Sequence, residues 1–460
     1  MFNYSFWADE AYISGIASAL ITGKHSILQA FNALSYQKLY ILTIALFFKI
    51  FGVSEFSARL PSMIIFLIGI IIIFLLAKKL SNVYGGLASA FLYTFSHLNL
   101  AYATMARPYI ILETITLIIL YLLTQKKINH FMIIILCTIA MLLHSIGVLL
   151  WILYFIYLVL KFKSLKVLKL KQTNLQTFQL FNLGTLKPFN LLTFFTLAII
   201  GYIFILPIAL SSIGGGLLPY NNSYQVIKLL AYRYTFVSIC ALFGYVWLFK
   251  KHKTLSIAVL IYSVVVLFMA MFRAYIFNIR YVLPLFGILF LYSGIFFAKI
   301  GEKYFPKKIW IVPLIVAILF VRLPKSYYNP NIDKYGDIQI ANYKDFYSQL
   351  KKRFPNYKKL YVVNDTIDVE YWYFGRSSNT YFMKFTQKGT LANFKKTIKN
   401  HPQGLLIMED WQSLLPEDVK QYAKKNLKLE FRVESLKEAP DDPWPLALYS
   451  WGMGPKVRKF

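Results

Sequence analysis

Apolar residues in the first 322 positions form blocks that are separated by short polar segments. The blocks Leu60–Ala77 and Leu255–Met271 contain no charged side chain at all. A block of about 20 apolar residues is long enough to cross the ~30 Å hydrocarbon core of a bilayer. The pattern therefore predicts a multi-pass α-helical membrane protein, with spans at 60–77, 83–100, 109–124, 131–144, 146–160, 191–210, 231–249, 255–272, 281–298 and 309–322.

Two apolar segments need a separate interpretation. The block 131–160 is too long for one crossing, and the polar run His144-Ser145-Ile146-Gly147 predicts a tight hairpin within it. We interpret His144 as a turn residue at the interface, with a ligand role as the alternative. Gln37–Phe51 is interrupted by polar and charged residues, which favours an amphipathic helix lying in the membrane interface.

The positions of Lys and Arg predict the orientation. One set of loops carries clusters of Lys, whereas the alternate set carries few cations, so the Lys-rich set is expected to be cytoplasmic. Alternation then places residues 1–59 and the C-terminal region outside. This parity predicts one more span encoded upstream of Met1, unless Phe31–Phe51 itself crosses the membrane. The Lys-rich set comprises Lys78, Lys79, Lys126, Lys127, six Lys between 161 and 187, Lys250, Lys251, Lys253, Lys299, Lys303, Lys307 and Lys308.

The acidic residues mark a domain boundary. Only five of the 20 Asp and Glu residues precede position 323: Asp9, Glu10, Glu55, Glu113 and Glu302. We expect a transmembrane domain at 1–322 and a small α/β soluble domain at 323–460. Its predicted elements are strands at 360–363 and 404–408 and helices at 393–400 and 416–426. Three acids, Asp365, Asp368 and Glu370, could bind a metal or could belong to a solvated loop.

Composition changes this picture little. Hydrophobic residues make up 58% of the chain and charged residues 15%, which separates it from ordinary soluble proteins. A net charge of +30 would suggest nucleic acid, but much of the Lys excess lies in the loops, so we expect no nucleic-acid partner. The two cysteines, Cys137 and Cys240, lie far apart in apolar blocks and indicate no disulfide framework.

The dipeptide Asp9-Glu10 is the strongest candidate for chemistry. Acids are scarce before position 323, yet these two are adjacent, at the predicted outer interface, beside the aromatic residues Phe6, Trp7 and Tyr12. A carboxylate at a membrane surface is costly unless it is paired or functional. Partial desolvation raises the pKa of a carboxyl group toward the value that a general base needs. A solvated pair near a chain end is the alternative.

Several cations are expected at the same face of the membrane. Arg59, Arg107 and Arg280 each lie at the outer end of a predicted span, and Lys38 lies on the predicted interfacial helix. Each could be a snorkelling anchor, and Glu55 with Arg59 could be a simple i,i+4 pair. Together they indicate an anionic ligand, because Arg matches phosphate oxygens with two hydrogen bonds.

Through the motifs around these acids and cations, the chain resembles the GT-C superfamily of polyprenyl-phosphate-sugar glycosyltransferases, in particular bacterial protein O-mannosyltransferases and lipid A aminoarabinose transferases. The resemblance covers residues 5–300 in order and spacing. It departs at Tyr36-Gln37-Lys38-Leu39-Tyr40, where many relatives have a His-Pro-Pro-Leu-Tyr-like run, and the family's first span is missing. The motifs that carry the resemblance are Trp7-Ala8-Asp9-Glu10-Ala11-Tyr12, residues 51–62, Ala106-Arg107-Pro108-Tyr109 and Arg280-Tyr281-Val282-Leu283-Pro284.

The resemblance implies a reaction in which an acceptor hydroxyl attacks the anomeric carbon of a sugar on a polyprenyl phosphate. The family's first-loop acid corresponds to Asp9 as general base, with Glu10 as an orienting residue. The residues that bind the lipid phosphate correspond to Lys38, Arg59, Arg107 and Arg280, with Tyr109 and Tyr281 nearby. No Asp-x-Asp motif stands out in the membrane part, so we predict no cofactor and no catalytic metal.

The implied partners are the polyprenyl-phosphate sugar, the lipid bilayer, and an acceptor that is a protein, lipid A or another glycan. The expected location is the cell inner membrane, with the active site and the C-terminal domain outside the cytoplasm. A transporter or flippase for a lipid-linked sugar is the main alternative, and a non-catalytic scaffold is another. A transporter often has repeated halves, and no internal repeat is visible in the sequence.

Overall fold

The structure of the chain, a computed structural model, divides into two compact units. Unit 1 contains Met1–Ile64, Leu100–Arg107 and Pro324–Phe460, and unit 2 contains Ile65–Asn99 and Pro108–Leu323. The predicted span at 191–210 lies outside the described residues. The structure describes residues 5–6, 8–33, 37–172, 221–228, 230, 234–272, 279–321, 341–364, 368–375, 379–382, 384, 387–409, 415–434 and 445–453.

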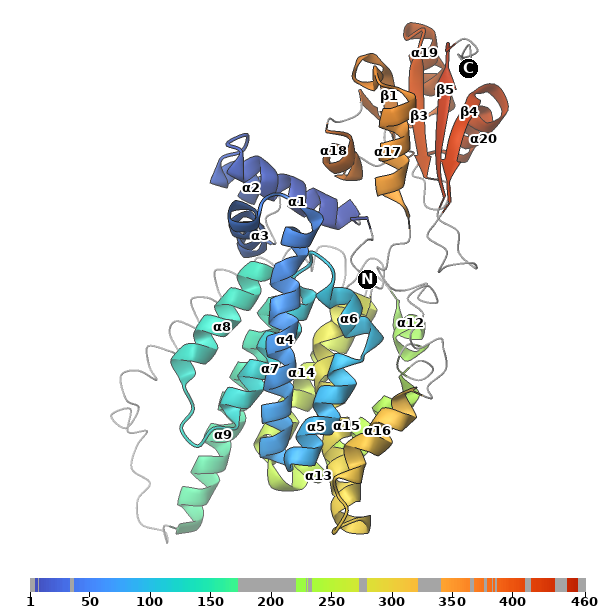
Figure 1. Cartoon of the computed structure of the whole chain (residues 1–460). Coiled ribbons are helices and arrows are strands. Elements are labelled where there is room, and N and C mark those ends of the chain that lie inside the picture. The colour runs from blue at the N-terminus through green and yellow to red at the C-terminus, as the bar shows by residue number, and fades with distance from the viewer. Residues whose placement is uncertain are drawn as a thin grey trace. The chain divides into compact units, whose positions relative to one another are not determined.

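Unit 2 is a bundle of apolar helices (Figure 1). Helix α15 (Leu283–Tyr304) is its centre, because it packs against α5 (Val83–Thr94), α7 (Tyr109–Leu123), α13 (Thr235–Lys251) and α16 (Ile311–Val321). The most apolar stretch of this helix is 83% buried. The corresponding share is 39% in both α4 (Glu55–Leu80) and α14 (Lys253–Phe272). The C-terminal part of α4 belongs to this unit. These three helices are long and apolar enough to cross a membrane.

Apolar side chains on the outer helices face away from the bundle. Leu67 and Ile71 of α4, Leu242 of α13 and Val264 of α14 are more than half exposed. In water such surfaces would be costly, whereas in a bilayer they face lipid. The helices of this unit therefore have the surface of a multi-pass membrane protein.

Small residues bring the central helices together. A side chain at Gly244 of α13 would collide with the carbonyl group of Tyr292, and one at Gly294 of α15 would collide with Ser89 of α5. Membrane helices use such positions to bring backbones into close contact. Ser89 and Ser293 also donate hydrogen bonds to carbonyl groups of neighbouring helices.

The predicted hairpin is confirmed. Helix α8 (His130–Leu143) ends at His144, a short 3-10 helix η1 (Ser145–Val148) follows, and α9 (Leu149–Gln172) begins directly after it. His144 has an extended backbone and accepts a hydrogen bond from Ile146 N through Nδ1 at 3.1 Å. This side chain caps the turn, as its position in the polar run predicted.

The span predicted at 83–100 is wrong as a single helix. The structure has α5 (Val83–Thr94) and then α6 (His97–Ala103), with a break at Phe95 and Ser96. Ser96 is fully buried and its hydroxyl accepts a hydrogen bond from Asn99 N. Hydroxyl side chains that bond to the backbone two or three residues on favour a new helix start, and hydropathy alone does not register this.

Unit 1 begins with three helices, α1 (Ala8–Ile21), α2 (Ile27–Ala33) and α3 (Lys38–Phe51). Helix α3 occupies the segment predicted to lie in the membrane interface; Tyr40, Ile44 and Phe48 are buried on one side and Leu46 and Ile50 are exposed on another. Gly52 ends α3 with φ +79°. Ser54 then accepts a hydrogen bond from Ser57 N at 3.1 Å and starts α4.

The rest of unit 1 is the α/β region predicted from the C-terminal sequence (Figure 1). Its five-stranded sheet has the order β2-β1-β3-β5-β4, in which β1 is parallel to β2 and β3, and β5 is antiparallel to β3 and β4. The elements are α17 (Tyr343–Arg353), η8 (Tyr357–Lys359), β1 (Tyr361–Asn364), α18 (Asp368–Phe374), β2 (Thr380–Tyr381), α19 (Leu391–Asn400), β3 (Gly404–Glu409), α20 (Glu417–Asn426), β4 (Lys428–Val433) and β5 (Leu446–Trp451).

Candidate active site

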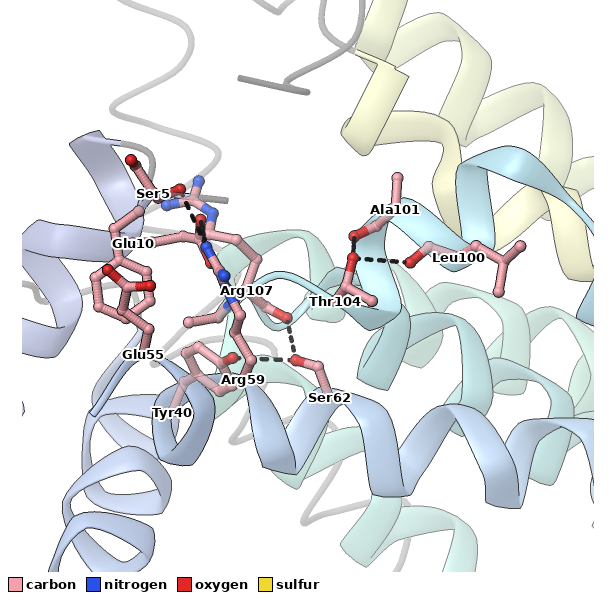
Figure 2. Close-up of polar contacts among 12 residues, drawn as sticks. Ser5, Glu10, Tyr40, Glu55, Arg59, Ser62, Leu100, Ala101, Thr104 and Arg107 are labelled. Carbon is pink, nitrogen blue, oxygen red and sulfur yellow. Dashed lines mark hydrogen bonds and ion pairs between the residues drawn. The ribbon is translucent and has the colours of Figure 1, made fainter. Parts of the chain in front are cut away.

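The Asp9-Glu10 pair lies in the first turn of α1, where negative charge is favoured by the helix dipole. Glu10 points into unit 1 and is 2% exposed. Its carboxylate accepts two hydrogen bonds from Arg59, from Nε to Oε1 at 3.1 Å and from Nη2 to Oε2 at 3.1 Å. Arg59 is 5% exposed, so the two charges form a buried, two-pronged ion pair (Figure 2).

The Glu10–Arg59 pair also holds backbone from two other segments. Ala106 N donates a hydrogen bond to Glu10 Oε1 at 2.6 Å, and Arg59 Nη2 donates one to the Ser5 carbonyl oxygen at 3.2 Å. The Arg59 guanidinium lies 5.0 Å from the centre of the Phe6 ring. The pair therefore ties the start of α1, the first turns of α4 and the segment 104–107 together.

Asp9 faces a different environment from that of its neighbour. Its side chain is 41% exposed and forms an ion pair with Arg107, with Oδ2 2.8 Å from Nη2. The Arg107 side chain is only 8% exposed. The dipeptide thus presents one carboxylate to the interior and one to the solvent-accessible side, with a cation beside each.

A chain of hydrogen bonds fixes the backbone of Arg107. Ser62 of α4 donates to the Arg107 carbonyl oxygen at 3.0 Å, and the Ser62 hydroxyl lies 3.1 Å from the Tyr40 hydroxyl. Both Tyr40 and Ser62 are fully buried. The cation that faces Asp9 is therefore positioned by α3 and α4 (Figure 2).

The remaining candidates from the sequence lie elsewhere. In unit 2, the Arg280 guanidinium lies 5.7 Å from the Tyr109 ring centre and 5.3 Å from the Tyr281 ring centre. The Tyr109 hydroxyl lies 3.3 Å from His144 Nε2. In unit 1, the Lys38 ammonium lies 5.8 Å from the Phe31 ring centre. The structure thus gathers Asp9, Glu10, Arg59 and Arg107 into one cluster and Tyr109, Arg280 and Tyr281 into another.

Tyr373 of α18 connects the C-terminal region to this first cluster. Its hydroxyl donates to Glu55 Oε1 at 2.5 Å and accepts from Phe6 N at 2.6 Å. Burial raises the pKa of Tyr373 well above its ordinary value of about 10, and the nearby Glu55 carboxylate raises it further. The phenol therefore stays protonated at neutral pH and can donate to Glu55.

Metal ligands are not grouped in the part of the chain that the structure describes, where no three His, Cys, Asp or Glu side chains come together. Among the three acids singled out in the C-terminal sequence, Asp365 and the side chain of Asp368 lie outside the described residues. Glu370 is buried and accepts a hydrogen bond from Asn364 Nδ2 at 2.8 Å.

Sequence reasoning assigned no role to three residues that support these clusters: Tyr40, Ser62 and Tyr373. Tyr40 and Ser62 lie within segments already noted, but nothing in the spacing of the three residues distinguishes them. His144 was interpreted as a turn residue, with a ligand role as the alternative, and it also contacts Tyr109. Its position at a polar break between two apolar blocks was the one available signal.

Comparisons with known proteins give a consistent result. A family model described as dolichyl-phosphate-mannose-protein mannosyltransferase matches residues 39–181, which include α3 to α9. A sequence comparison with curated proteins finds no match.

Solved structures with a similar fold include ArnT from Cupriavidus metallidurans. In the apo state it is 10% identical, with a TM-score of 0.58, and the match covers 99% of this chain and 96% of that one. Bound to undecaprenyl phosphate, ArnT is 11% identical with a TM-score of 0.53 and the same coverage. The apo oligosaccharyltransferase from Archaeoglobus fulgidus is 10% identical with a TM-score of 0.52, over 88% of this chain and 66% of that one. At such identities the likeness establishes the fold.

Proposed function

We propose that this chain is a membrane glycosyltransferase of the GT-C superfamily, which moves a sugar from a polyprenyl phosphate to an acceptor hydroxyl. The family match and the shared fold confirm the resemblance inferred from the motifs. The observation that carries the proposal is the asymmetry of the Asp9-Glu10 pair, in which a partly exposed Asp9 faces Arg107 and a buried Glu10 is paired with Arg59.

Exposure and pairing favour Asp9 as the general base. A base has to reach the proton of the acceptor hydroxyl, and Asp9 is 41% exposed, whereas the Glu10 side chain is 3% exposed. Glu10 has both oxygens engaged by Arg59 and one of them also by Ala106 N. We therefore assign Glu10 and Arg59 a positioning role, in which they hold α1 and the segment that carries Arg107.

In the proposed reaction Asp9 takes the proton of the acceptor hydroxyl as its oxygen attacks the anomeric carbon. The new bond forms as the bond between that carbon and the phosphate oxygen breaks, with inversion, and the polyprenyl phosphate leaves with the electron pair. Cations stabilise the negative charge on the leaving phosphate. Arg107, which pairs with Asp9, is assigned this role. Lys38 and Arg280 are proposed for it from the resemblance of their motifs, and the rings of Tyr109 and Tyr281 lie against the Arg280 guanidinium.

The fold neighbours support the substrate class of the proposal. ArnT has been crystallised with undecaprenyl phosphate, and the oligosaccharyltransferase with an acceptor peptide. For this chain we propose a polyprenyl-phosphate sugar as donor and an outer-face acceptor at the inner membrane. Protein hydroxyls, lipid A and other glycans remain the acceptor classes to be compared.

The test is a transfer assay on the purified full chain in nanodiscs. Radiolabelled polyprenyl-phosphate sugars are incubated with a Ser/Thr-rich peptide, lipid A or a glycan, and wild type is compared with Asp9→Asn and the control Asp345→Asn. Asp9→Asn keeps size but removes the proton acceptor, so transfer should fall by about 10²–10⁴-fold while donor binding persists. Asp345 is exposed on α17 and belongs to neither cluster, so its replacement should leave the rate unchanged.

Transfer at the normal rate by Asp9→Asn would remove the assignment of the base. If wild type binds the lipid-linked sugar and moves it across the bilayer without transferring it, the protein is a transporter instead.

A further inference from the structure

A pocket lies within unit 1, and none of its lining residues belongs to the Asp9–Arg107 cluster. Because that cluster is the first candidate site, we call this one the second pocket. It encloses about 600 Å³, a size typical of ligand pockets. It is bounded by α1, by the turn between α3 and α4, and by residues of α17 and α18. The polar and aromatic side chains that the argument uses are Ser18, Ser54, Glu55, Lys344, Tyr371 and Trp372.

Two aromatic rings form one wall of this pocket. Trp372 is held rigidly, because its ring lies 4.9 Å from that of Phe6 and 6.1 Å from that of Phe48, and both of these residues are buried. Tyr371 is 38% exposed and lies against α1 at Gly15. The wall therefore offers the flat apolar faces of two rings, and contacts with buried residues and with α1 hold these rings in place.

A negatively charged residue, a positively charged residue and two hydroxyl groups complete the lining of the pocket. Glu55 Oε1 accepts a hydrogen bond from Tyr373, which orients the carboxylate. Lys344 is exposed at the start of α17, where its backbone N–H donates to Ser5 Oγ at 3.0 Å. Ser18 of α1 and Ser54 add hydroxyl groups. Flat apolar surface next to a carboxylate, an ammonium group and hydroxyl groups suits a saccharide, which has apolar C–H faces and many hydroxyls.

Other ligand classes fit this lining less well. A lipid phosphate would face the Glu55 carboxylate, and the pocket has a single Lys and no Arg to offset that repulsion. A peptide bound as an added strand needs an exposed sheet edge, and no strand lines the pocket.

The position of the pocket relates it to the proposed base. Ser18 lies nine residues after Asp9 in the same helix, which is roughly 14 Å along the helix axis at about 1.5 Å per residue and about half a turn around the axis. Glu55 lies one helical turn before Arg59, whose guanidinium is paired with Glu10. A ligand that fills the pocket and also reaches Asp9 must therefore be longer than one sugar ring.

We propose that this pocket binds a saccharide ring of the acceptor, so that the enzyme transfers its sugar onto a glycan of more than one ring. The inference rests on the proposed glycosyltransferase function and specifies its acceptor class. In this arrangement Tyr371 and Trp372 stack on the ring, while Glu55 and Lys344 bind its hydroxyl groups.

The test measures binding without any donor. The full chain in nanodiscs is titrated with a disaccharide of N-acetylglucosamine, a disaccharide of mannose and a Ser/Thr-rich peptide, followed by saturation-transfer NMR. We expect at least one disaccharide to bind. Tyr371→Ala should raise its Kd about tenfold because a stacking surface is lost, and Lys344→Gln should raise it severalfold. The matched controls are Lys351→Gln in the same helix and Tyr304→Ala, another exposed tyrosine.

Absence of binding by both disaccharides would overturn the inference, as would equal binding by Tyr371→Ala, Lys344→Gln and wild type. Binding of the peptide alone, weakened by the same two variants, would assign the pocket to a protein acceptor instead. This titration contains no donor, so binding is measured apart from the transfer step. A failure of the acceptor pocket can therefore be told from a failure of the proposed base, which affects transfer alone.

Discussion

At the scale of residues, Asp9 and Glu10 are adjacent in sequence but have different partners and different proposed roles. Asp9 and Glu10 follow each other in α1, and successive helical residues point about 100° apart. One side chain therefore turns to Arg107 and the other to Arg59. The buried pair is stable only as a pair, because a charge left alone in the interior is strongly destabilising.

This gives a prediction for Glu10→Gln. The Gln amide would keep one acceptor oxygen but place an NH2 donor against the Arg59 guanidinium, which is itself only a donor, so the buried cation would lose its counter-charge and one of its two acceptors. We expect a loss of about 3–5 kcal/mol in the free energy of unfolding, measured by chemical denaturation in detergent. Glu417→Gln is the control, since the Glu417 side chain is 70% exposed. The double variant Glu10→Gln/Arg59→Met should recover part of the loss, and no recovery would argue against the ion pair as the cause.

At the scale of elements, one side chain of α18 supplies hydrogen bonds to the N-terminal segment and to α4. The Tyr373 hydroxyl bonds both Glu55 of α4 and the Phe6 backbone. These contacts also orient the carboxylate that lines the second pocket. A variant of Tyr373 should therefore change a local attachment and leave the sheet of the C-terminal region intact.

We predict that Tyr373→Phe increases hydrogen exchange at the Phe6 amide, because that N–H loses its acceptor. An unsatisfied buried group costs about 1–3 kcal/mol, which corresponds to about 5- to 150-fold faster exchange if local opening is the route. The sign of the pH effect follows from the raised pKa of Tyr373. The hydrogen bond that Tyr373 donates to Glu55 is fully present below about pH 10 and is lost as the pH rises further, whereas the Tyr373 oxygen can still accept from Phe6 N. Equal exchange at pH 7 would contradict this role of Tyr373.

The turn between α3 and α4 depends on the backbone conformation of Gly52. It ends α3 with φ +79° and ψ 163°, a region of backbone conformation that is essentially restricted to glycine. No heavy atom lies within 4 Å of the position that a Cβ would occupy, so Gly52→Ala should be penalised by backbone strain alone. We expect a loss of about 1–3 kcal/mol in the free energy of unfolding, seen in the same denaturation assay. A neutral effect would show that the turn can relax.

At the scale of the whole molecule, the orientation in the membrane is the main prediction. The Lys-rich loops are expected in the cytoplasm and the C-terminal region outside. In intact cells a cysteine at Lys127 should resist an impermeant thiol reagent, and one at Ser348 in α17 should react. Both positions are exposed, and the native Cys137 and Cys240 are buried, which keeps the background low. The reverse pattern would place the Asp9 cluster on the cytoplasmic side.

Local patterns were sufficient for much of the architecture. Apolar blocks predicted the helices of the bundle, the polar run at His144 predicted the hairpin, and β1, β3, α19 and α20 were expected close to their observed positions. The two strands β4 and β5 were not. β5 is buried throughout and short, and β4 alternates charged with apolar residues at the edge of the sheet. Besides pairing with its neighbour β4, β5 pairs with β3, which lies well before it in the chain, and no local window contains both strands.

By itself the sequence determined that this protein crosses a membrane, that it resembles GT-C glycosyltransferases, and that Asp9 and Glu10 are its notable acids. These follow from hydrophobic length, charge asymmetry and local motifs. Tertiary structure alone decided that Glu10 forms an ion pair with Arg59, that Asp9 forms one with Arg107, and that Tyr373 donates a hydrogen bond to Glu55. The choice of partner depends on helix rotation and on which cation is buried, because a buried carboxylate is stable only where a donor geometry matches it.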